Sequence, residues 1–425
     1  MANNFDSNFS RKLMKIFLKA FESSRVLTKT VNTQLLTGKF TPSSGTVVDF
    51  KRPTDYRTHR TAGGDISSVT KSDIITGKAS GTVQNYFTAA TEWANVDEAL
   101  KMDQLEQLIS PMATRIVTDL EVDFADYMMK NSHMVQGTVG TAVATWADVA
   151  NAGALMASTG VPSDSPWYYV FNPFTQVALA DVQKGLTSAD SLVSTAWEKA
   201  QISRPIAGLQ ALTGVSLGSY TTDSEADRAG TLSAAPDMTY VTAKDTMQQT
   251  LAVTGLGAGA TVIKAGDVIE ITGTSILNKS TRTAALDGTG AAIPFRAVVA
   301  ADVTLTAGAG NIVINGPFLN ETNGQYNTAE LVGGGALAGT EVITVLGSAS
   351  TTYQPNMFYH PEAFSIGTVK IPKLFSTDTT ATTEDGFSLR VSKYADGDTN
   401  VQKVRFDLLP AYATLNPFLS GHGWG

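Results

Sequence analysis

Residues 231–350 differ in pattern from the rest of the chain, and this difference constrains the fold more than any other feature. The segment holds 16 of the 37 glycines, and its apolar residues fall in short runs separated by turn residues. The runs include MTYVTA, QQTLAVTG, DVIEITG, IPFRAVVAA, NIVINGP and EVITVLG. Short strands at regular intervals are typical of a small β-sandwich or barrel. Because mixed helix and strand patterns flank the segment, we predict an all-β domain of residues 224–350 inserted into an α+β chain.

The most regular helical pattern follows Pro111. Apolar residues recur from there to Lys130 at spacings of three and four, namely at Met112, Ile116, Leu120, Phe124 and Tyr127. Ser110 is a favourable N-cap and Pro111 suits the first helical position, so we predict a helix that begins there and extends for roughly 30 Å. Four acidic residues along it are interpreted as its solvated or subunit-facing side: Asp119, Glu121, Asp123 and Asp126.

Residues 141–222 mix the two patterns. WADVANAGALMAS and SADSLVSTAWEKAQ have helical spacing, whereas WYYVFNP between them is an apolar run that ends in an Asn-Pro turn. We therefore predict two helices with a buried strand between them.

Residues 9–36 carry an amphipathic and basic pattern. The apolar positions recur at helical spacing, at Leu13, Ile16, Phe17, Ala20 and Phe21. Four cations surround them, namely Arg11, Lys12, Lys15 and Lys19. Such a helix suits a membrane surface or an arm that docks on a partner subunit. We favour the docking arm, because residues 24–40 continue without a membrane anchor, and we take the four cations as candidate assembly residues.

Residues 46–90 indicate two strands joined by a long polar loop that contains KRPTDYRTHRTAGGD. A loop of this length without a core of its own is usually functional or disordered, and its Gly-Gly pair suits a turn. The loop carries several cations in an otherwise acidic protein. We therefore predict that Arg52, Arg57 and Arg60 take part in assembly, and that Arg57 and Arg60 pair with acidic residues of a neighbouring subunit.

Two long alternating runs near the C-terminus flank the sequence ADGDTN. Asp396 and Asp398 have the spacing of the first calcium ligands of an EF-hand. The sixth and twelfth positions of that loop would, however, be Val401 and Asp407 instead of glycine and glutamate. Asp-Gly between alternating strands favours a hairpin. We predict a long, twisted hairpin in which one set of apolar residues faces another: Phe387, Leu389 and Val391 against Val404, Phe406 and Leu408.

The composition excludes several classes of function. The absence of cysteine removes disulfides, thiolate metal sites and cysteine nucleophiles. No histidine has a partner at zinc-ligand spacing, and no serine lies in a Gly-x-Ser-x-Gly elbow. GLGAGA at 255–260 is followed by a strand pattern, whereas a dinucleotide site needs a helix there. We therefore expect no catalytic residue, no metal, no cofactor and no enzymatic activity.

Charge and apolar runs narrow the choice of partners. The net charge of −8 argues against a protein that neutralises duplex nucleic acid. Lysines interrupt the apolar residues of the N-terminus, so it does not have a signal-peptide pattern, and no apolar run is long enough to span a membrane. Charged residues make up only 16% of the chain. We expect a protein of the cytoplasm, without a membrane partner, much of whose surface meets other protein.

The C-terminal sequence KYADGDTNVQKVRFDLLPAYATLNP resembles the major capsid (coat) proteins of short-tailed double-stranded DNA bacteriophages of enteric bacteria. The basic arm and three further stretches are similar as well: VVDFKRPTDYRTHRTAGGDIS, QLEQLISPMATRIVTDLE and SLVSTAWEKAQI. The resemblance covers the whole chain except its glycine-rich part. Its specificity lies in the number and order of these stretches.

The resemblance implies the Hong Kong ninety-seven type capsid fold with an inserted all-β immunoglobulin-like domain. The implied parts are an N-terminal arm (1–40), an E-loop (41–90), a P-domain with a spine helix (91–140), an A-domain (141–223), the inserted β domain (224–350) and a return to the A-domain and P-domain that ends in the hairpin (351–425).

The implied function is to assemble as hexamers and pentamers into an icosahedral shell around double-stranded DNA. The implied partners are other copies of the chain, a scaffolding protein and a portal protein, and the insertion leaves room for a decoration protein. Assembly would take place in the host cytoplasm, and the product would be the virion capsid, which encloses DNA without sequence-specific binding.

Two other classes of protein stay open. One is a different structural protein, such as an encapsulating compartment made by a cell, a tail-tube protein or a surface-layer protein. The other is an enzyme with an immunoglobulin-like accessory domain. The lack of a catalytic cluster disfavours the enzyme, and the lack of a signal-peptide pattern disfavours the surface layer.

Overall fold

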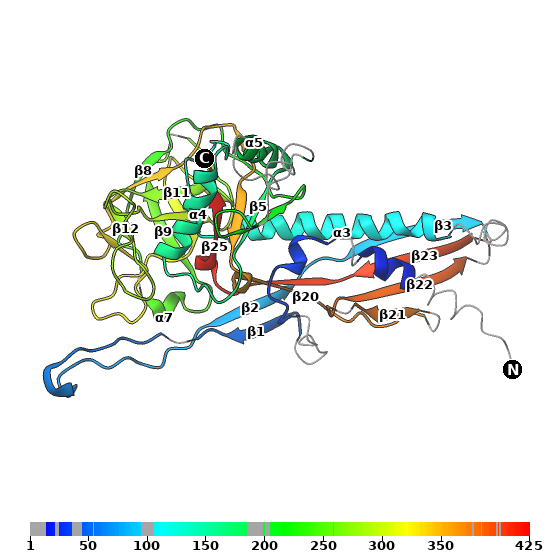
Figure 1. Ribbon diagram of the computed structural model, residues 1–425, viewed down its shortest axis with the longest axis horizontal. Coiled ribbons are helices and arrows are strands. Elements are labelled where there is room, and N and C mark those ends of the chain that lie inside the picture. The colour runs from blue at the N-terminus through cyan, green and yellow to red at the C-terminus, as the bar shows by residue number, and fades with distance from the viewer. Residues whose placement is uncertain are drawn as a thin grey trace. The chain divides into compact units, whose positions relative to one another are not determined.

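Two units built from interleaved stretches of sequence make up the chain. The computed structural model describes residues 14–21, 25–35, 45–53, 55–94, 105–184, 199, 205–237, 239–257, 259–375, 378–383, 385–396, 398 and 401–425. Unit 1 comprises Met1–Asp49, Ser80–Ala125 and Phe364–Thr414. Unit 2 comprises Phe50–Ala79, Asp126–Ala363 and Leu415–Gly425. Figure 1 shows the elements of both.

Two four-stranded sheets organise unit 1. The first has the order β1 (Val47–Lys51), β2 (Lys78–Val83), β24 (Pro410–Thr414) and β20 (Phe364–Thr368). The second has the order β21 (Thr379–Thr382), β22 (Ser388–Asp396), β23 (Val401–Leu408) and β3 (Phe87–Ala94). Both sheets join strands that lie far apart in the sequence, as the light blue β3 beside the orange-red β23 illustrates (Figure 1).

The predicted C-terminal hairpin is confirmed. β22 and β23 pair antiparallel, with Leu389 opposite Leu408 and Val391 opposite Phe406. All four side chains are buried. β3 adds a third strand by pairing with the whole of β23, a contact between segments about 300 residues apart that no local pattern announces.

A helix of residues 14–21 packs its apolar face into unit 1. Phe17 and Phe21 are fully buried. The ring of Phe17 stacks on Phe406 of β23 with 4.4 Å between the centroids, and the ring of Phe21 lies 5.7 Å from that of Phe387. The chain's own hairpin therefore covers the aromatic residues of this helix, and docking of the arm on a partner subunit stays a prediction.

Helix α3 (Leu105–Lys130), the long cyan helix of Figure 1, is the predicted helix with a different start. It begins at Leu105, so Pro111 lies inside it instead of in its first turn. The predicted cap at Ser110 is wrong. A proline inside a helix removes one backbone hydrogen bond, whereas each further residue of helix adds one, so an established helix can continue through it.

A five-stranded mixed sheet lies in unit 2. Its order is β4 (Met134–Gln136), β25 (Ser420–Gly423), β19 (Asn356–Tyr359), β5 (Tyr168–Phe171) and β6 (Gln210–Thr213). The predicted buried strand in WYYVFNP is confirmed as β5, and helix α5 (Pro173–Lys184) follows it.

The predicted helix in WADVANAGALMAS is confirmed as α4 (Trp146–Ser158). It begins with a capping box, in which the Thr145 side chain accepts from the Asp148 backbone and the Asp148 carboxylate accepts from the Thr145 backbone. The helix predicted in SADSLVSTAWEKAQ lies outside the described residues, except for Lys199.

Six strands within residues 229–345 close into a barrel. Their order is β11 (Val268–Ile271), β13 (Arg296–Val299), β15 (Gly310–Asn315), β9 (Gln248–Thr254), β8 (Ala229–Leu232) and β17 (Val342–Val345). The barrel interior is apolar and includes the fully buried Leu251, Ile269, Ile312 and Ile343. An immunoglobulin domain would instead pack two separate sheets face to face.

The chain enters and leaves the barrel through two neighbouring strands. β7 (Tyr220–Thr221) pairs with β18 (Thr352–Tyr353), with Thr221 opposite Thr352. This pairing brings the two ends of the barrel segment together, which is the geometry that an inserted domain requires.

Short elements complete both units. They are β10 (Thr261–Ile263) paired with β14 (Val303–Leu305), β12 (Thr274–Ile276) paired with β16 (Ala329–Leu331), helix α7 (Tyr240–Ala243), and the 3₁₀ turns η1 (Leu27–Lys29), η2 (Ala62–Gly64), η4 (Pro361–Ala363) and η5 (Pro417–Leu419). The strand β10 follows the GLGAGA sequence, so the structure does not provide the helix that a dinucleotide site would need there.

The variant Phe17→Ala should destabilise unit 1. Removing a fully buried aromatic ring costs roughly 3–5 kcal/mol of unfolding free energy. Chemical denaturation of the purified monomer measures this loss. Lys15→Ala is the matched control on the exposed side of the same helix and should change the unfolding free energy by less than about 0.5 kcal/mol. Equal stability of the two variants would contradict the packing of this helix in unit 1.

A fragment of residues 224–350 should fold alone. All members of the barrel's hydrophobic core lie between Leu232 and Val345, so the fragment keeps its apolar interior. We expect a β-type circular dichroism spectrum and a cooperative thermal transition. A disordered spectrum would contradict the prediction and would show that the barrel needs other parts of unit 2.

Candidate functional site

The basic loop between β1 and β2 combines exposed cations with exposed apolar side chains. Arg57 and Arg60 are exposed, and neither forms an ion pair with any residue that the structure describes. The neighbouring apolar residues are also open to solvent: Tyr56 is 56% exposed, Ile66 44% and Ile74 79%. Aromatic residues and arginines are enriched at protein interfaces, so this loop has the chemistry of a contact surface.

Arg52 differs from the other two loop arginines, because its own chain surrounds it. Its side chain is buried. Its Nε donates to the carbonyl oxygen of Leu415 at 2.8 Å, and its Nη1 donates to those of Lys244 and Asp245 at 2.8 and 2.7 Å. Burial lowers the pKa of the Arg52 guanidinium from its usual value. The structure thus assigns Arg52 a role within the subunit, unlike Arg57 and Arg60.

The cations of the N-terminal arm are only partly described. Lys15 and Lys19 are exposed on the helix of residues 14–21, away from its buried phenylalanines. Arg11 and Lys12 lie outside the described residues. Lys15 and Lys19 therefore form a small basic surface on a helix that its own subunit holds in place.

Glu121 of α3 anchors the arm that follows this helix. Its carboxylate accepts hydrogen bonds from the backbone N–H groups of Val26, Leu27 and Thr28 at 3.2, 2.7 and 3.1 Å, and from the Thr28 hydroxyl at 2.7 Å. The side chain is only 5% exposed. The interpretation of Glu121 as part of a solvated or subunit-facing side is therefore wrong, because four donors of the same chain replace water around the carboxylate.

A signal for the burial of Glu121 does exist in the sequence. Glu121 lies four residues after Val117 and three before Phe124, which are both buried, so it occupies the apolar face of the helix. Of the other acids on α3, Asp119 pairs with Arg115 across one exposed turn and Asp126 pairs with Lys130. Asp123 accepts a hydrogen bond from the hydroxyl of Tyr412 at 2.9 Å.

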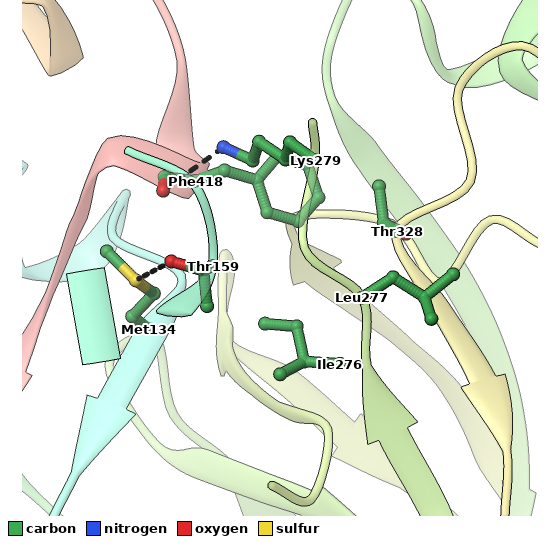
Figure 2. A pocket seen from close by; sticks show the side chains of 7 residues that line it. All are labelled: Met134, Thr159, Ile276, Leu277, Lys279, Thr328 and Phe418. Carbon is green, nitrogen blue, oxygen red and sulfur yellow. Dashed lines mark hydrogen bonds between the residues drawn. The ribbon is translucent and has the colours of Figure 1, made fainter. Parts of the chain in front are cut away.

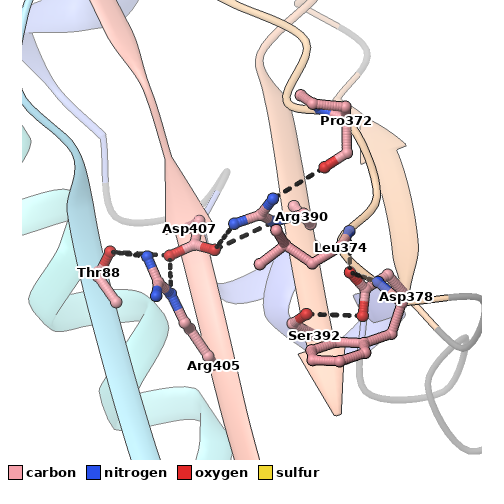
Figure 3. Close-up of polar contacts among 9 residues, drawn as sticks. Thr88, Pro372, Leu374, Asp378, Arg390, Ser392, Arg405 and Asp407 are labelled. Carbon is pink, nitrogen blue, oxygen red and sulfur yellow. Dashed lines mark hydrogen bonds and ion pairs between the residues drawn. The ribbon is translucent and has the colours of Figure 1, made fainter. Parts of the chain in front are cut away.

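A buried ionic cluster holds the second sheet of unit 1 together (Figure 3). Asp407 is fully buried and accepts from Arg390 on β22, from Arg405 on β23 and from the hydroxyl of Thr88 on β3. Arg390 also donates to the carbonyl oxygen of Pro372 at 2.8 Å. All partners are strands or loops of the same sheet, so the cluster is structural.

Asp378 holds an adjacent loop in the same way. Its Oδ2 accepts from the backbone N–H groups of Leu374 and Phe375 at 2.7 and 3.0 Å, and its Oδ1 accepts from the hydroxyl of Ser392 at 2.6 Å (Figure 3). The carboxylate therefore ties the loop to β22.

A cavity in unit 2 is too small for an organic ligand. Figure 2 shows its lining: Met134, Thr159, Ile276, Leu277, Lys279, Thr328 and Phe418. The Nζ of Lys279 donates to the carbonyl oxygen of Phe418 at 3.3 Å and lies 4.7 Å from its ring centroid. The space amounts to about 10 Å³, which is barely enough for one water molecule.

Two of the buried histidines, His133 and His422, are structural as well. His133 donates from Nδ1 to the carbonyl oxygen of Asn315, and His422 donates from Nε2 to that of Met129, both at 2.9 Å. Burial lowers the pKa of His133 to about 3 and that of His422 to about 4. Both imidazoles are therefore neutral at pH 7 and have a backbone partner.

The described part of the chain offers neither a cluster of metal ligands nor a membrane-spanning helix. No group of three or more histidine, aspartate or glutamate side chains there could hold a metal ion. Within the same ranges, no helix combines the length and the apolar character needed to cross a membrane.

The variant Glu121→Gln should release the arm. The amide replaces one acceptor oxygen with a donor that faces backbone donors, at a cost of roughly 1–3 kcal/mol. Hydrogen exchange at residues 26–28 should accelerate, and the unfolding free energy should fall. Asp119→Asn is the matched control on the exposed side of α3, where the loss of one ion pair costs less than about 1 kcal/mol. An equal effect of both variants would contradict the anchoring role of Glu121.

The chain is similar in sequence to a known protein family and to a known capsid protein. The family described as P22 coat protein, gene protein 5, matches residues 1–424. The major capsid protein of Acyrthosiphon pisum secondary endosymbiont phage 1 is 40% identical over 428 residues, which cover 100% of both chains.

Solved structures with a similar course of the chain are more distant in sequence. A protein of Mycobacterium phage Che8 is 11% identical, with 93% of this chain and 90% of that chain covered and a TM-score of 0.46. The virus-like particle from Pyrococcus furiosus is 7% identical, with 97% and 98% covered and a TM-score of 0.40.

The family match extends over almost every residue, and the 40% identity to a capsid protein spans the full length. The chain therefore belongs to the P22 coat protein family: it is a major capsid protein, a structural component of the phage virion and not an enzyme.

Proposed function

We propose that copies of the chain assemble as hexamers and pentamers into an icosahedral shell that encloses double-stranded DNA. The observation that carries the proposal is the family match over residues 1–424. Arg57 and Arg60 support it, because both are exposed and form no ion pair with a described residue, which leaves a basic surface for a neighbouring copy of an acidic protein.

We also propose the Hong Kong ninety-seven type arrangement of parts for this chain. The loop between β1 and β2 supports an E-loop within residues 41–90, and α3 supports the spine helix of a P-domain within 91–140. One sheet combines β5 and β6 from residues 141–223, β19 and β25 from residues 351–425, and β4 from residues 91–140. This sharing of a sheet supports an A-domain (141–223) to which the chain returns within residues 351–425.

The β-barrel supports an accessory domain of residues 224–350. The pairing of β7 with β18 brings its ends together, and its core is self-contained. We propose that it takes the place of the immunoglobulin-like domain of this group, with a closed barrel as its core, and that it offers a surface on which a decoration protein binds.

The same proposal includes partners other than further copies of the chain. Lys15 and Lys19, with Arg11 and Lys12 beside them in the sequence, offer a basic arm to an acidic segment of a scaffolding protein. A portal protein would occupy one vertex. The net charge of −8 suits a container that packaged DNA does not bind tightly.

Reversing the charge of both loop arginines should block assembly. In the double variant Arg57→Glu, Arg60→Glu, like charges would face the acidic residues that we propose on the neighbouring copy, which costs several kcal/mol per joint. Negative-stain electron microscopy should show few or no closed particles, whereas circular dichroism should show a folded subunit.

Net charge itself needs a control. Lys370→Glu, Lys373→Glu makes the same change of charge at two exposed lysines. If this control assembles and the loop variant does not, the effect belongs to the loop. Normal particles from the loop variant would contradict the contact proposed for Arg57 and Arg60.

A further inference from the structure

Both limbs of the basic loop are fastened at their base to the segment that forms the insertion. On the outgoing limb, which follows β1, Arg52 donates to the carbonyl oxygens of Lys244 and Asp245 at 2.8 and 2.7 Å. Three residues further on, Asp55 forms an ion pair with Arg282. The three partners Lys244, Asp245 and Arg282 all lie within residues 224–350.

The returning limb is held in the same region. Gln325, which is buried, uses its side-chain amide to pair with both backbone groups of Asp73: the Asp73 N–H donates to Oε1 at 3.0 Å, and Nε2 donates to the Asp73 carbonyl oxygen at 2.9 Å. The backbone N–H of Lys78 donates to Oδ1 of Asp245 at 3.1 Å. Between them, Ile75 packs on an apolar cluster around helix α7: Tyr240, Ala243, Met247, Leu319, Tyr326 and Phe418.

At Gly77 the returning limb packs directly against the backbone of Lys244. A Cβ atom at this position would lie 2.2 Å from the carbonyl oxygen of Lys244. Backbone cannot yield as a flexible side chain can, so only glycine permits the approach. The limbs are also joined to each other there, because the N–H of Arg52 donates to the carbonyl oxygen of Gly77 at 2.8 Å.

Beyond this base the loop forms a different set of hydrogen bonds. Among the described residues from 56 to 72, every hydrogen bond stays within the loop, such as that from the Arg57 N–H to the Ser72 hydroxyl at 2.9 Å. About nine residues on each limb separate the base from the Gly63-Gly64 turn, which gives an extended reach of up to about 30 Å. A small rotation at the base therefore moves the tip by a large distance.

We infer that the insertion acts as a brace for the basic loop. Lys244, Asp245, Arg282 and Gln325 hold the base, and they thereby fix the direction in which Arg57 and Arg60 are presented. The fastening itself is a property of a single subunit. Its consequence for the shell rests on the proposed function, because only an assembling subunit needs its loop to point at a neighbour.

Hydrogen–deuterium exchange on the purified full-length subunit tests the fastening. Gly77→Ala should speed exchange of the amides in residues 72–79 about tenfold, because the limb must leave its seat. Gly288→Ala is the matched control, since a Cβ there meets nothing within 4 Å, and it should leave exchange in residues 72–79 unchanged. Unchanged exchange in both variants would overturn the brace.

Charge exchange across the Asp55–Arg282 pair tests the consequence for assembly. Asp55→Arg and Arg282→Asp should each yield irregular or fewer particles by electron microscopy, and the double variant should restore regular ones. Single variants that assemble like the wild type would overturn the role of this pair in assembly. A double variant no better than the singles would overturn it as well, because the effect would then come from other contacts of the two residues. If the wild-type subunit formed no shells even together with its scaffolding protein, the proposed function would fail, whereas the exchange result would still decide whether the insertion braces the loop.

Discussion

The parts of unit 1 are joined through one buried carboxylate. A carboxylate that leaves water must find donors, and Glu121 finds four of them in residues 26–28. This contact joins the arm to α3, and the helix just before it places Phe17 and Phe21 against the C-terminal hairpin. The N-terminal segment, α3 and the C-terminal hairpin lie far apart in the sequence, and none of them has a hydrophobic core of its own. In unit 1 they form one core together.

Local pattern was enough to predict most of the individual elements. The hairpin of β22 and β23, the helix α4, the strand β5 and the glycine-rich strands of the barrel all follow from periodicity and turn residues. The errors have long-range causes. The start of α3 and the burial of Glu121 depend on what packs against them, and β3 is held as a strand by its pairing with β23, about 300 residues away. No window of neighbouring residues contains that information.

The arginines of the basic loop also differ in how far the sequence predicts their role. Arg57 and Arg60 are exposed, as a basic contact surface requires, and that expectation needed only composition and loop length. Arg52 has the same charge and lies in the same loop, yet it serves its own subunit, because the carbonyl oxygens of Lys244, Asp245 and Leu415 converge on it. The charge of an arginine does not tell whether its side chain is exposed for a contact or buried in its own subunit. That depends on which residues lie around it in the folded chain.

The closed barrel has a consequence for solubility. An open sheet ends in strands whose free N–H and C=O groups accept strands from other molecules, which is a common route to aggregation. The six strands of the barrel leave no such edge. A capsid subunit must reach high local concentrations and still associate only through its correct contacts. These six strands therefore cannot take up a further strand, and any contact that they make with another molecule must pass through side chains and loops, where shape and charge can discriminate between a correct neighbour and a wrong one.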